Sequence, residues 1–363
     1  WAQLARMRGL VAALLTTCCL AFPPALPTAP ITVNGTFPLG LGRNTGLIIG
    51  KTRDLLFTLE PNNNLPKLTG PLELFRLDVG DGSGPLRIAE SAKMPFAHWN
   101  SATLQIDPLT YVVMSQNPDT GVYGVHVLVG QGDLASLVVK NNVTFPPSDR
   151  YTYWYAGFDD QQRLFYAFCG HLSLLVSVNI DSGALMSLPM PSNLTAYAML
   201  VEPSSQYVAV CDDMDLVRYS LPDFRAVASS SGIYCVELSP FSDGIIAALP
   251  APPGGSLVAA ILFNSTLAHT PSLPVCREGQ VSPFTMTTDN SSRLYVPGSD
   301  GNYNGFVTVY TSKGGLDLTC TSDFTFDIDG HLQTVNQRGD FCVIASSVNG
   351  GNVTVEARCV LQE

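Results

Sequence analysis

The chain has 363 residues, of which 46% are hydrophobic and 13% are charged, and it contains 31 Gly and 26 Pro. This composition is typical of a globular protein that is long enough to bury a large core. The 19 Lys+Arg against 30 Asp+Glu give a formal net charge of -11. Because no basic surplus is available to neutralise phosphates, we do not expect nucleic acid or an anionic membrane surface as a partner.

Residues 1–29 are predicted to form a signal-peptide region. Arg8 precedes the apolar run 10–22, and small residues and prolines follow as far as Ala29, which is the order of regions in a secretory signal. The apolar run is too short to span a bilayer. A buried N-terminal helix is the alternative interpretation. Met7 is a plausible initiator, so we interpret the sequence as the translation of an incomplete transcript. We expect its C-terminus to be incomplete as well.

Six Asn-X-Ser/Thr sequons support export. Each lies beside turn residues, where a bulky glycan is tolerated. The six acceptors are Asn34, Asn142, Asn193, Asn264, Asn290 and Asn352. An unmodified Asn turn is the alternative at each position. Together with the signal, the sequons predict a glycoprotein that is secreted or displayed on the extracellular face of the cell.

The cysteines agree with an oxidising compartment. Removing residues 1–29 leaves seven of the nine, and no CxxC spacing occurs, so neither a zinc knuckle nor a thioredoxin-like site is supported. The residues 349–352 (NGGN) predict a two-residue hairpin turn. Counting outward from it, Cys342 and Cys359 face each other as a non-hydrogen-bonded pair, which suits a disulfide.

Five further cysteines have no pairing that the sequence determines. They are Cys169, Cys211, Cys235, Cys276 and Cys320. Because five is an odd number, at least one is free or pairs with another chain. Cys211 with Cys235 is one candidate pair.

Residues 30–363 are predicted to form a single all-β domain. Short runs rich in Val, Leu, Ile, Tyr and Phe alternate with Gly/Pro/Asn/Asp clusters every eight to twelve residues or so. A unit of two strands joined by a polar turn recurs seven times, with a period of about 48 residues, in the range expected for four-stranded repeats. The second strands of the units begin near Leu55, Tyr111, Leu164, Tyr207, Ile245, Leu294 and Phe341.

The ends of the repeat array complement each other. The last unit ends after its third strand, 353–357, whereas the first unit is preceded by a spare strand-like stretch, 31–36. We expect this N-terminal strand to complete the last unit, which would remove two exposed sheet edges. Across the mature chain the pattern resembles the seven-bladed β-propeller superfold, without the WD dipeptide or the Kelch double glycine of particular families. A large irregular β-sandwich, or a pair of β domains, is the alternative.

The segment 300–305 is the best metal-like motif. Asp300, Asn302 and Asn304 place oxygens at positions 1, 3 and 5, and a glycine follows at position 6, as calcium loops require. The ninth and twelfth positions are both threonines, so the closing ligand is missing. A weak calcium site is therefore one interpretation, and a polar hairpin loop is the other.

No catalytic residue is assigned. GxSxG, GxxxxGK[ST] and HExxH motifs are absent, and no GxGxxG follows a strand. We interpret the acidic clusters 78–81 and 212–215 as loop carboxylates, and the scattered histidines as individual surface or strand residues. The histidines are His98, His126, His171, His269 and His331. Aromatic candidates for stacking on sugars or peptides are Trp99, Tyr153, Trp154 and Tyr303, although each also fits core packing.

These patterns favour a secreted or cell-surface binding module for an extracellular protein or glycan, because such repeats present many loops on one rigid face. One alternative is a hydrolase or lactonase-like enzyme with a site assembled at the central channel, one residue from each repeat. The other is the N-terminal ectodomain of a longer receptor or adhesion protein.

Overall fold

In the computed structural model, the regular structure of the described residues is almost entirely β-strand, and the 3-10 helix η2 (Gly170–Leu172) is the helix described among them. The structure describes residues 31–37, 41–49, 55–61, 73–78, 87–94, 99–107, 109–117, 119–133, 136–147, 153–192, 194, 196–202, 205–212, 215–242, 245–250, 258–269, 273–274, 280–281, 286–288, 293–299, 305–314, 317–325, 331–337, 340–349 and 352–360. The predicted signal region therefore lies outside the described residues.

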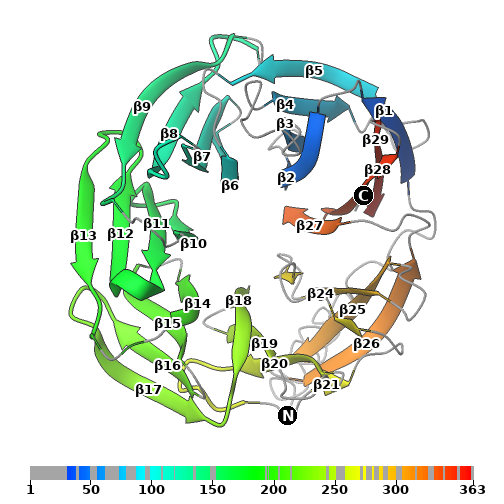
Figure 1. The fold of residues 1–363 in the computed structure, drawn as a ribbon. Coiled ribbons are helices and arrows are strands. Elements are labelled where there is room, and N and C mark those ends of the chain that lie inside the picture. The colour runs from blue at the N-terminus through cyan, green and yellow to red at the C-terminus, as the bar shows by residue number, and fades with distance from the viewer. Residues whose placement is uncertain are drawn as a thin grey trace, which may run out of the picture.

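The described strands pair into seven antiparallel sheets arranged around a central space (Figure 1). Five sheets each contain four consecutive strands. These are β2 (Leu41–Ile49), β3 (Leu55–Pro61), β4 (Glu73–Asp78) and β5 (Arg87–Lys93); β6 (Trp99–Asp107), β7 (Thr110–Gln116), β8 (Tyr123–Val129) and β9 (Val138–Thr144); β10 (Trp154–Asp159), β11 (Leu164–Cys169), β12 (Leu174–Asn179) and β13 (Leu185–Pro189); β14 (Ala196–Val201), β15 (Tyr207–Asp212), β16 (Asp215–Ser220) and β17 (Arg225–Ser231); and β18 (Cys235–Ser242), β19 (Ile245–Pro250), β20 (Val258–Phe263) and β21 (Leu273–Pro274).

The remaining two sheets depart from this pattern. One contains β22 (Gln280–Val281), β24 (Arg293–Ser299), β25 (Gly305–Gly314) and β26 (Asp317–Thr325), with β23 (Thr287–Thr288) also paired to β24; the other contains β27 (His331–Gln337), β28 (Asp340–Asn349), β29 (Asn352–Val360) and β1 (Ile31–Phe37). In the second of these sheets, β1 pairs antiparallel with β29, and Ile31 lies opposite Cys359. The stretch expected to complete the last unit is thus a strand of that sheet.

The strand positions expected from the repeat are confirmed. Strands β3, β11, β15 and β19 begin at the predicted residues, and β7, β24 and β28 begin one residue earlier. The hairpin register is also as predicted, because Asn349 lies opposite Asn352 and Cys342 lies opposite Cys359 across β28 and β29.

The middle strands β7, β8, β11, β12 and β15 are largely buried, because their sheets pack face to face against neighbouring sheets. In β11, Phe165 and Ala167 belong to the core shared with the β6–β9 sheet. Tyr166 and Phe168 belong to the core shared with the β14–β17 sheet. Successive strand residues point to opposite faces. Continuous apolar runs such as LFYAF therefore indicate strands buried between two sheets.

The outer strands are exposed. In β9, β13 and β17, most of the side chains are exposed or partly exposed. Strands β2, β6, β10, β14, β18 and β27 lie nearest the central space (Figure 1). There, β2 contacts β6, β6 contacts β10, β10 contacts β14, and β14 contacts β18. In addition, β23 contacts both β18 and β27, and β27 contacts β2.

A β-bulge recurs in five of the first strands. In β2, β6, β10, β14 and β18, a recurring extra residue interrupts the pairing with the second strand of the sheet, and β2, β6 and β18 each contain a second register shift. The extra residues are Thr45, Ser101, Ala156, Tyr197 and Val236. A bulge bends the strand and increases its twist. Its recurrence therefore gives these first strands a similar local bend.

The position after the bulge is small in four of the five strands. It is occupied by Gly46, Ala102, Gly157 and Ala198, and by Glu237 in β18. At Gly157 the reason is visible, because an added Cβ would lie 2.8 Å from the carbonyl oxygen of Val201 in the next sheet. The φ of Gly157 is also +150°, a value that L side chains rarely adopt.

Two arginines form hydrogen bonds that link neighbouring sheets. Arg163 donates to Asp107 of β6 at 2.9 Å and to Asp181 at 3.2 Å. Arg218 of β16 forms two hydrogen bonds with Glu202, at 2.6 and 2.7 Å, and also donates to the carbonyl oxygen of Ser265 at 3.1 Å. Each arginine thus ties its own sheet to an adjacent one.

The close approach at Gly157 predicts a large cost for an added methyl group. We expect Gly157→Ala to lower the free energy of unfolding by roughly 2–4 kcal/mol, since it adds a steric clash to backbone strain. Gly132→Ala is the matched control, because Gly132 has φ +119° but nothing within 4 Å of an added Cβ. It should cost only about 1 kcal/mol, from backbone strain alone. Denaturant unfolding measures both values, and equal losses would contradict the role of close packing.

Candidate functional site

A groove of about 550 Å³ runs along the first strands of three neighbouring sheets, β10, β14 and β18, and lies within the size range of small-molecule and side-chain binding pockets. Its described lining is mainly apolar and aromatic. It includes Trp154, Tyr155, Phe158, Tyr197, Met199, Glu237, Leu238, Ser239 and Met286. We call this feature the aromatic groove.

Three aromatic side chains of the groove are exposed. Trp154 is 55% exposed, Tyr197 is 47% exposed and Tyr155 is 39% exposed. Trp154 and Tyr155 are the first two residues of β10, and Tyr197 is the extra residue of the β14 bulge. Since a bulge re-aims a side chain, the bulge accounts for the outward position of Tyr197. Exposed aromatic residues grouped in this way mark interaction sites.

Neighbouring rings hold two of these side chains. Tyr197 makes an edge contact with Tyr234, with ring centroids 5.5 Å apart and an interplanar angle of 68°. Tyr155 contacts the buried ring of Phe165 at 5.4 Å. Such contacts restrict the rotamers of the rings before any ligand arrives, which lowers the entropic cost of binding.

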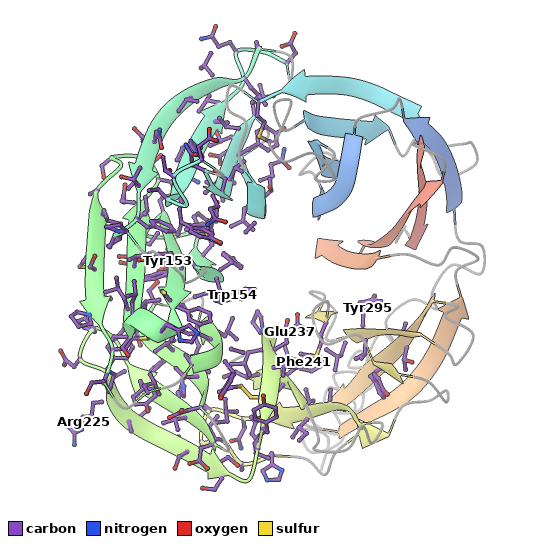
Figure 2. The ribbon with its side chains drawn as sticks, in the orientation of Figure 1. Tyr153, Trp154, Arg225, Glu237, Phe241 and Tyr295 are labelled. Atoms are coloured by element: carbon purple, nitrogen blue, oxygen red, sulfur yellow. A yellow bond between two sulfur atoms is a disulfide. The ribbon has the colours of Figure 1, made fainter. Side chains whose placement is uncertain are left out.

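Glu237 is the one charged side chain among the described residues that line the groove. One of its carboxylate oxygens, Oε2, accepts a hydrogen bond from the backbone N–H of Met286 at 3.1 Å. That contact orients the carboxylate on the wall formed by β18. Figure 2 shows Trp154 and Glu237 on the side of the sheets that faces the central space.

A disulfide joins Cys211 of β15 to Cys235 of β18, the strand that forms this wall, and the two Cα atoms are 5.7 Å apart. The candidate pair is therefore confirmed. Cys235 is the residue before the β18 bulge, two positions from Glu237, so the bridge fixes the groove wall to the neighbouring sheet. Cys169 is free and buried.

The aromatic candidates from the sequence have different outcomes. Trp154 lines the groove as an exposed ring, whereas the expectation of a stacking role for Tyr153 is wrong. Tyr153 is buried against Tyr123 and Phe145, and its hydroxyl donates to the carbonyl oxygen of Pro146 at 3.1 Å. Burial raises the pKa of the Tyr153 phenol to about 12. The Trp99 side chain and Tyr303 lie outside the described residues.

The metal-like and acidic motifs form no site in the described part of the chain. Asp300, Asn302 and Asn304 lie outside the described residues, so the calcium loop stays a prediction. Asp212 and Asp215 face each other across the β15–β16 hairpin, as expected for turn carboxylates. Within the described ranges, no group of three or more His, Cys, Asp or Glu side chains is arranged to hold a metal ion.

Three of the histidines have described side chains, and each lies in a different part of the fold. His126 is buried in β8, and His171 is exposed in η2. His269 is exposed and forms an isolated bridge with Phe263.

Four of the six sequon asparagines lie among the described residues, and glycosylation stays a prediction at all six positions. Asn142 is exposed on β9. Asn264 occupies a turn in which its Oδ1 accepts from the backbone N–H groups of Thr266 and Ala268. Asn34 and Asn352 lie in β1 and β29, and Asn193 and Asn290 lie outside the described residues. The Cys342–Cys359 bridge stays a prediction, because only the backbone register of these residues is described.

Tyr155, Tyr197 and Glu237 were missed by the sequence analysis. The sequence alone carried no signal for them, because the repeats can be aligned at the bulge only once the strand pairing is known. That alignment places Trp99, Trp154 and Tyr234 at the same position, two residues before the extra residue. The same alignment shows Glu237 where the other four first strands carry Gly or Ala.

No family model matches the chain, and its sequence matches no curated protein. Among solved structures it is similar to a crystal structure of BBS1N in complex with ARL6DN, soaked with mercury. The TM-score is 0.55 and the sequence identity is 12%, over 92% of this chain and 98% of that chain. The matched domain is a β-propeller.

The fold of this chain is that of a β-propeller. Its repeated four-stranded antiparallel sheets match those of the solved propeller. At this level of identity the likeness shows the fold alone, so the function has to be argued from the residues of the groove. In the part of the chain that the structure describes, no helix has the length and apolar character needed to cross a bilayer.

The disulfide behind the groove predicts a measurable loss of stability on its removal. The bridge closes a loop with a sequence separation of 24, so we expect the double variant Cys211→Ala, Cys235→Ala to lower the free energy of unfolding by about 3 kcal/mol. Cys169→Ala controls for the loss of a buried sulfur and should cost less. Denaturant unfolding at equal protein concentration compares the two. Equal losses would show that the cross-link adds nothing to stability.

Proposed function

We propose that this chain is an exported β-propeller that binds a protein partner at the aromatic groove. The observation that carries the proposal is the grouping of three exposed aromatic side chains and one carboxylate along β10, β14 and β18. Aromatic residues that project from a rigid scaffold into a concave, mostly apolar surface are typical of the energetic centre of protein interfaces.

The proposal includes a propeller of seven blades closed by its N-terminal strand. The seven sheets of the described strands support this count. The order of contacts from β2 through β6, β10, β14, β18, β23 and β27 back to β2 supports a continuous ring. In such a ring β1 completes the sheet of β27, β28 and β29, which joins the two ends of the domain and leaves fewer exposed sheet edges.

A protein partner is favoured over a glycan by two observations. BBS1N, the similar propeller, was crystallised in complex with ARL6DN, so a domain of this fold serves as a protein-binding surface. Among the described lining residues, Glu237 and Ser239 are the polar side chains outside the aromatic ones, and their neighbours are mostly apolar. Sugar recognition needs several hydrogen-bonding side chains to replace water, and an apolar wall does not supply them. A glycan is therefore the alternative that the binding experiment tests.

Export is supported by chemistry that belongs to an oxidising compartment. The Cys211–Cys235 disulfide fits the secretory route, since cytosolic proteins keep their thiols reduced. Asn142 is an acceptor of the Asn-X-Thr type that is exposed on an outer strand, where a glycan meets no steric obstacle. Both observations agree with a signal peptide in residues 1–29.

The groove variants test the binding function. We select peptides from a phage-displayed random library against the purified chain and measure their affinities by calorimetry. Trp154→Ala and Tyr197→Ala should each weaken binding by about tenfold or more, because each removes an aromatic anchor. Met186→Ala is the control, since Met186 is exposed on the outer strand β13. Unchanged affinity in both groove variants, or selective binding to a glycan array, would overturn the proposal.

Expression of the full chain in eukaryotic cells tests export. We expect the protein in the medium, with a mass that falls on treatment with peptide N-glycosidase. Thr144→Ala should remove one glycan by destroying the Asn142 sequon, whereas Thr144→Ser preserves the sequon and should keep the glycan. Intact-mass spectrometry measures each step. A protein that is retained in the cytosol without glycans would contradict export.

A further inference from the structure

We propose that an N-linked glycan on Asn142 keeps the outer edge of strand β9 from pairing with a second copy of this chain. The inference goes beyond binding at the aromatic groove, and it rests on one part of the proposed function, the export of the chain. It follows from the position of Asn142 at a sheet edge, the exposed apolar side chains beside it and the protection of the other outer strands.

Strand β9 forms the outer edge of its sheet. It pairs with β8 on one side, and among the described strands none continues the sheet on the other side. Val138 is 44% exposed and Val139 is 40% exposed. A sheet edge with free backbone groups and exposed β-branched side chains is a template on which a strand of another chain can pair. This edge therefore needs protection.

The first half of β9 carries two protective features. Lys140 is an extra residue in the pairing with β8, so the strand has a bulge there. Bulges and lysines are common devices against pairing at a sheet edge. The Lys140 ammonium, however, lies 3.4 Å from Oδ1 of Asp181, and Arg163 also donates to Asp181. Charges of both signs thus meet beside β9, and the bulge protects residues 138–140 alone.

The second half of β9 is regular and uncharged. It pairs with β8 without a register shift, from Asn141 opposite Val127 to Thr144 opposite Gly124. Its sequence, NNVT, contains the sequon formed by Asn142 and Thr144. Asn142 is exposed. The half of the strand that lacks a charge and a bulge is therefore the half that can carry a glycan.

The glycan leaves β9 from a face that has exposed apolar surface. Asn142 lies opposite His126, and Val139 lies opposite Leu128. Because His126 and Leu128 are two positions apart in β8, Asn142 and Val139 share one face of the sheet. Paired strands lie about 4.8 Å apart. A bulky glycan on this face overlaps the side chains that a paired strand would place beside β9.

The other outer strands support this interpretation. Protective devices occur on five of them, because β5, β17 and β26 contain charged residues, β13 ends at Pro189 and β21 has two residues. Strand β1, with the sequence ITVNGTF, contains neither a charged residue nor a proline, and it carries Asn34 of another sequon. Sequons thus occur on β1, which lacks these devices, and on β9, where they protect half of the strand.

Substitutions in the sequon test the inference. Asn142→Gln and Thr144→Ala remove the glycan, Asn142→Lys removes it but places a charge at the same edge position, and Thr144→Ser keeps it. We express each protein in eukaryotic cells, measure its intact mass and measure self-association by sedimentation velocity. The fraction of dimer and larger species should rise at least about threefold for Asn142→Gln and Thr144→Ala. It should stay unchanged for Asn142→Lys and Thr144→Ser.

Asn264→Asp is the control for a glycan at another place. Asn264 lies in the turn after β20, where its Oδ1 accepts from the backbone N–H groups of Thr266 and Ala268. Asp keeps this acceptor and removes the sequon, so self-association should stay unchanged. Amide hydrogen exchange of residues 138–144 in Asn142→Gln should slow as the protein concentration rises, which locates the contact at β9. Thermal unfolding checks that each variant is folded.

The outcomes separate this inference from the proposed function. If Asn142→Gln and Thr144→Ala lose a glycan and do not associate, the inference is wrong while export stands. If Asn142→Lys associates as strongly as Asn142→Gln, the glycan acts through general solubility and not at the strand edge, so the inference is again wrong. A secreted chain without a glycan on Asn142 also overturns it. Retention in the cytosol would overturn export itself.

Discussion

Face-to-face packing of neighbouring sheets is the constraint on which the rest of this molecule depends. A single four-stranded sheet of this sequence has two apolar faces, and both have to be covered. The residues of β11 show this directly, because Phe165 and Ala167 belong to one core and Tyr166 and Phe168 to another. No sheet is therefore a stable unit alone, and each one fixes the position of the next.

The same packing creates the groove. Close approach of the first strands requires small residues after the bulge, as at Gly157 opposite Val201. The bulge also re-aims side chains at the start of these strands toward the central space. Trp154 and Tyr197 line the groove on a framework that a disulfide and two ring contacts reinforce. A site built on strands in this way is more precise than one built on loops.

Glu202 shows how this fold accommodates a nearly buried charge. Glu202 is nearly buried and is compensated by Arg218, which itself stacks on Tyr207 and reaches the neighbouring sheet. Removing one partner of such a pair leaves an uncompensated charge, which is costly. Glu237 occupies the groove wall beside exposed rings. The similarity to a solved propeller at 12% identity shows the fold, and these local differences carry the argument about function.

The sequence by itself determined the strand positions, the repeat and the hairpin register of Cys342 and Cys359, because apolar runs, turn residues and two-residue hairpins act over a few neighbouring residues. It could not distinguish the buried Tyr153 from the exposed Trp154, since adjacent residues of a strand point to opposite faces and only the surrounding sheets decide which face is buried. Tyr197 and Glu237 became site residues only in the tertiary structure. Their positions depend on a bulge in pairing and on strands from three separate sheets, which are contacts that no local pattern encodes.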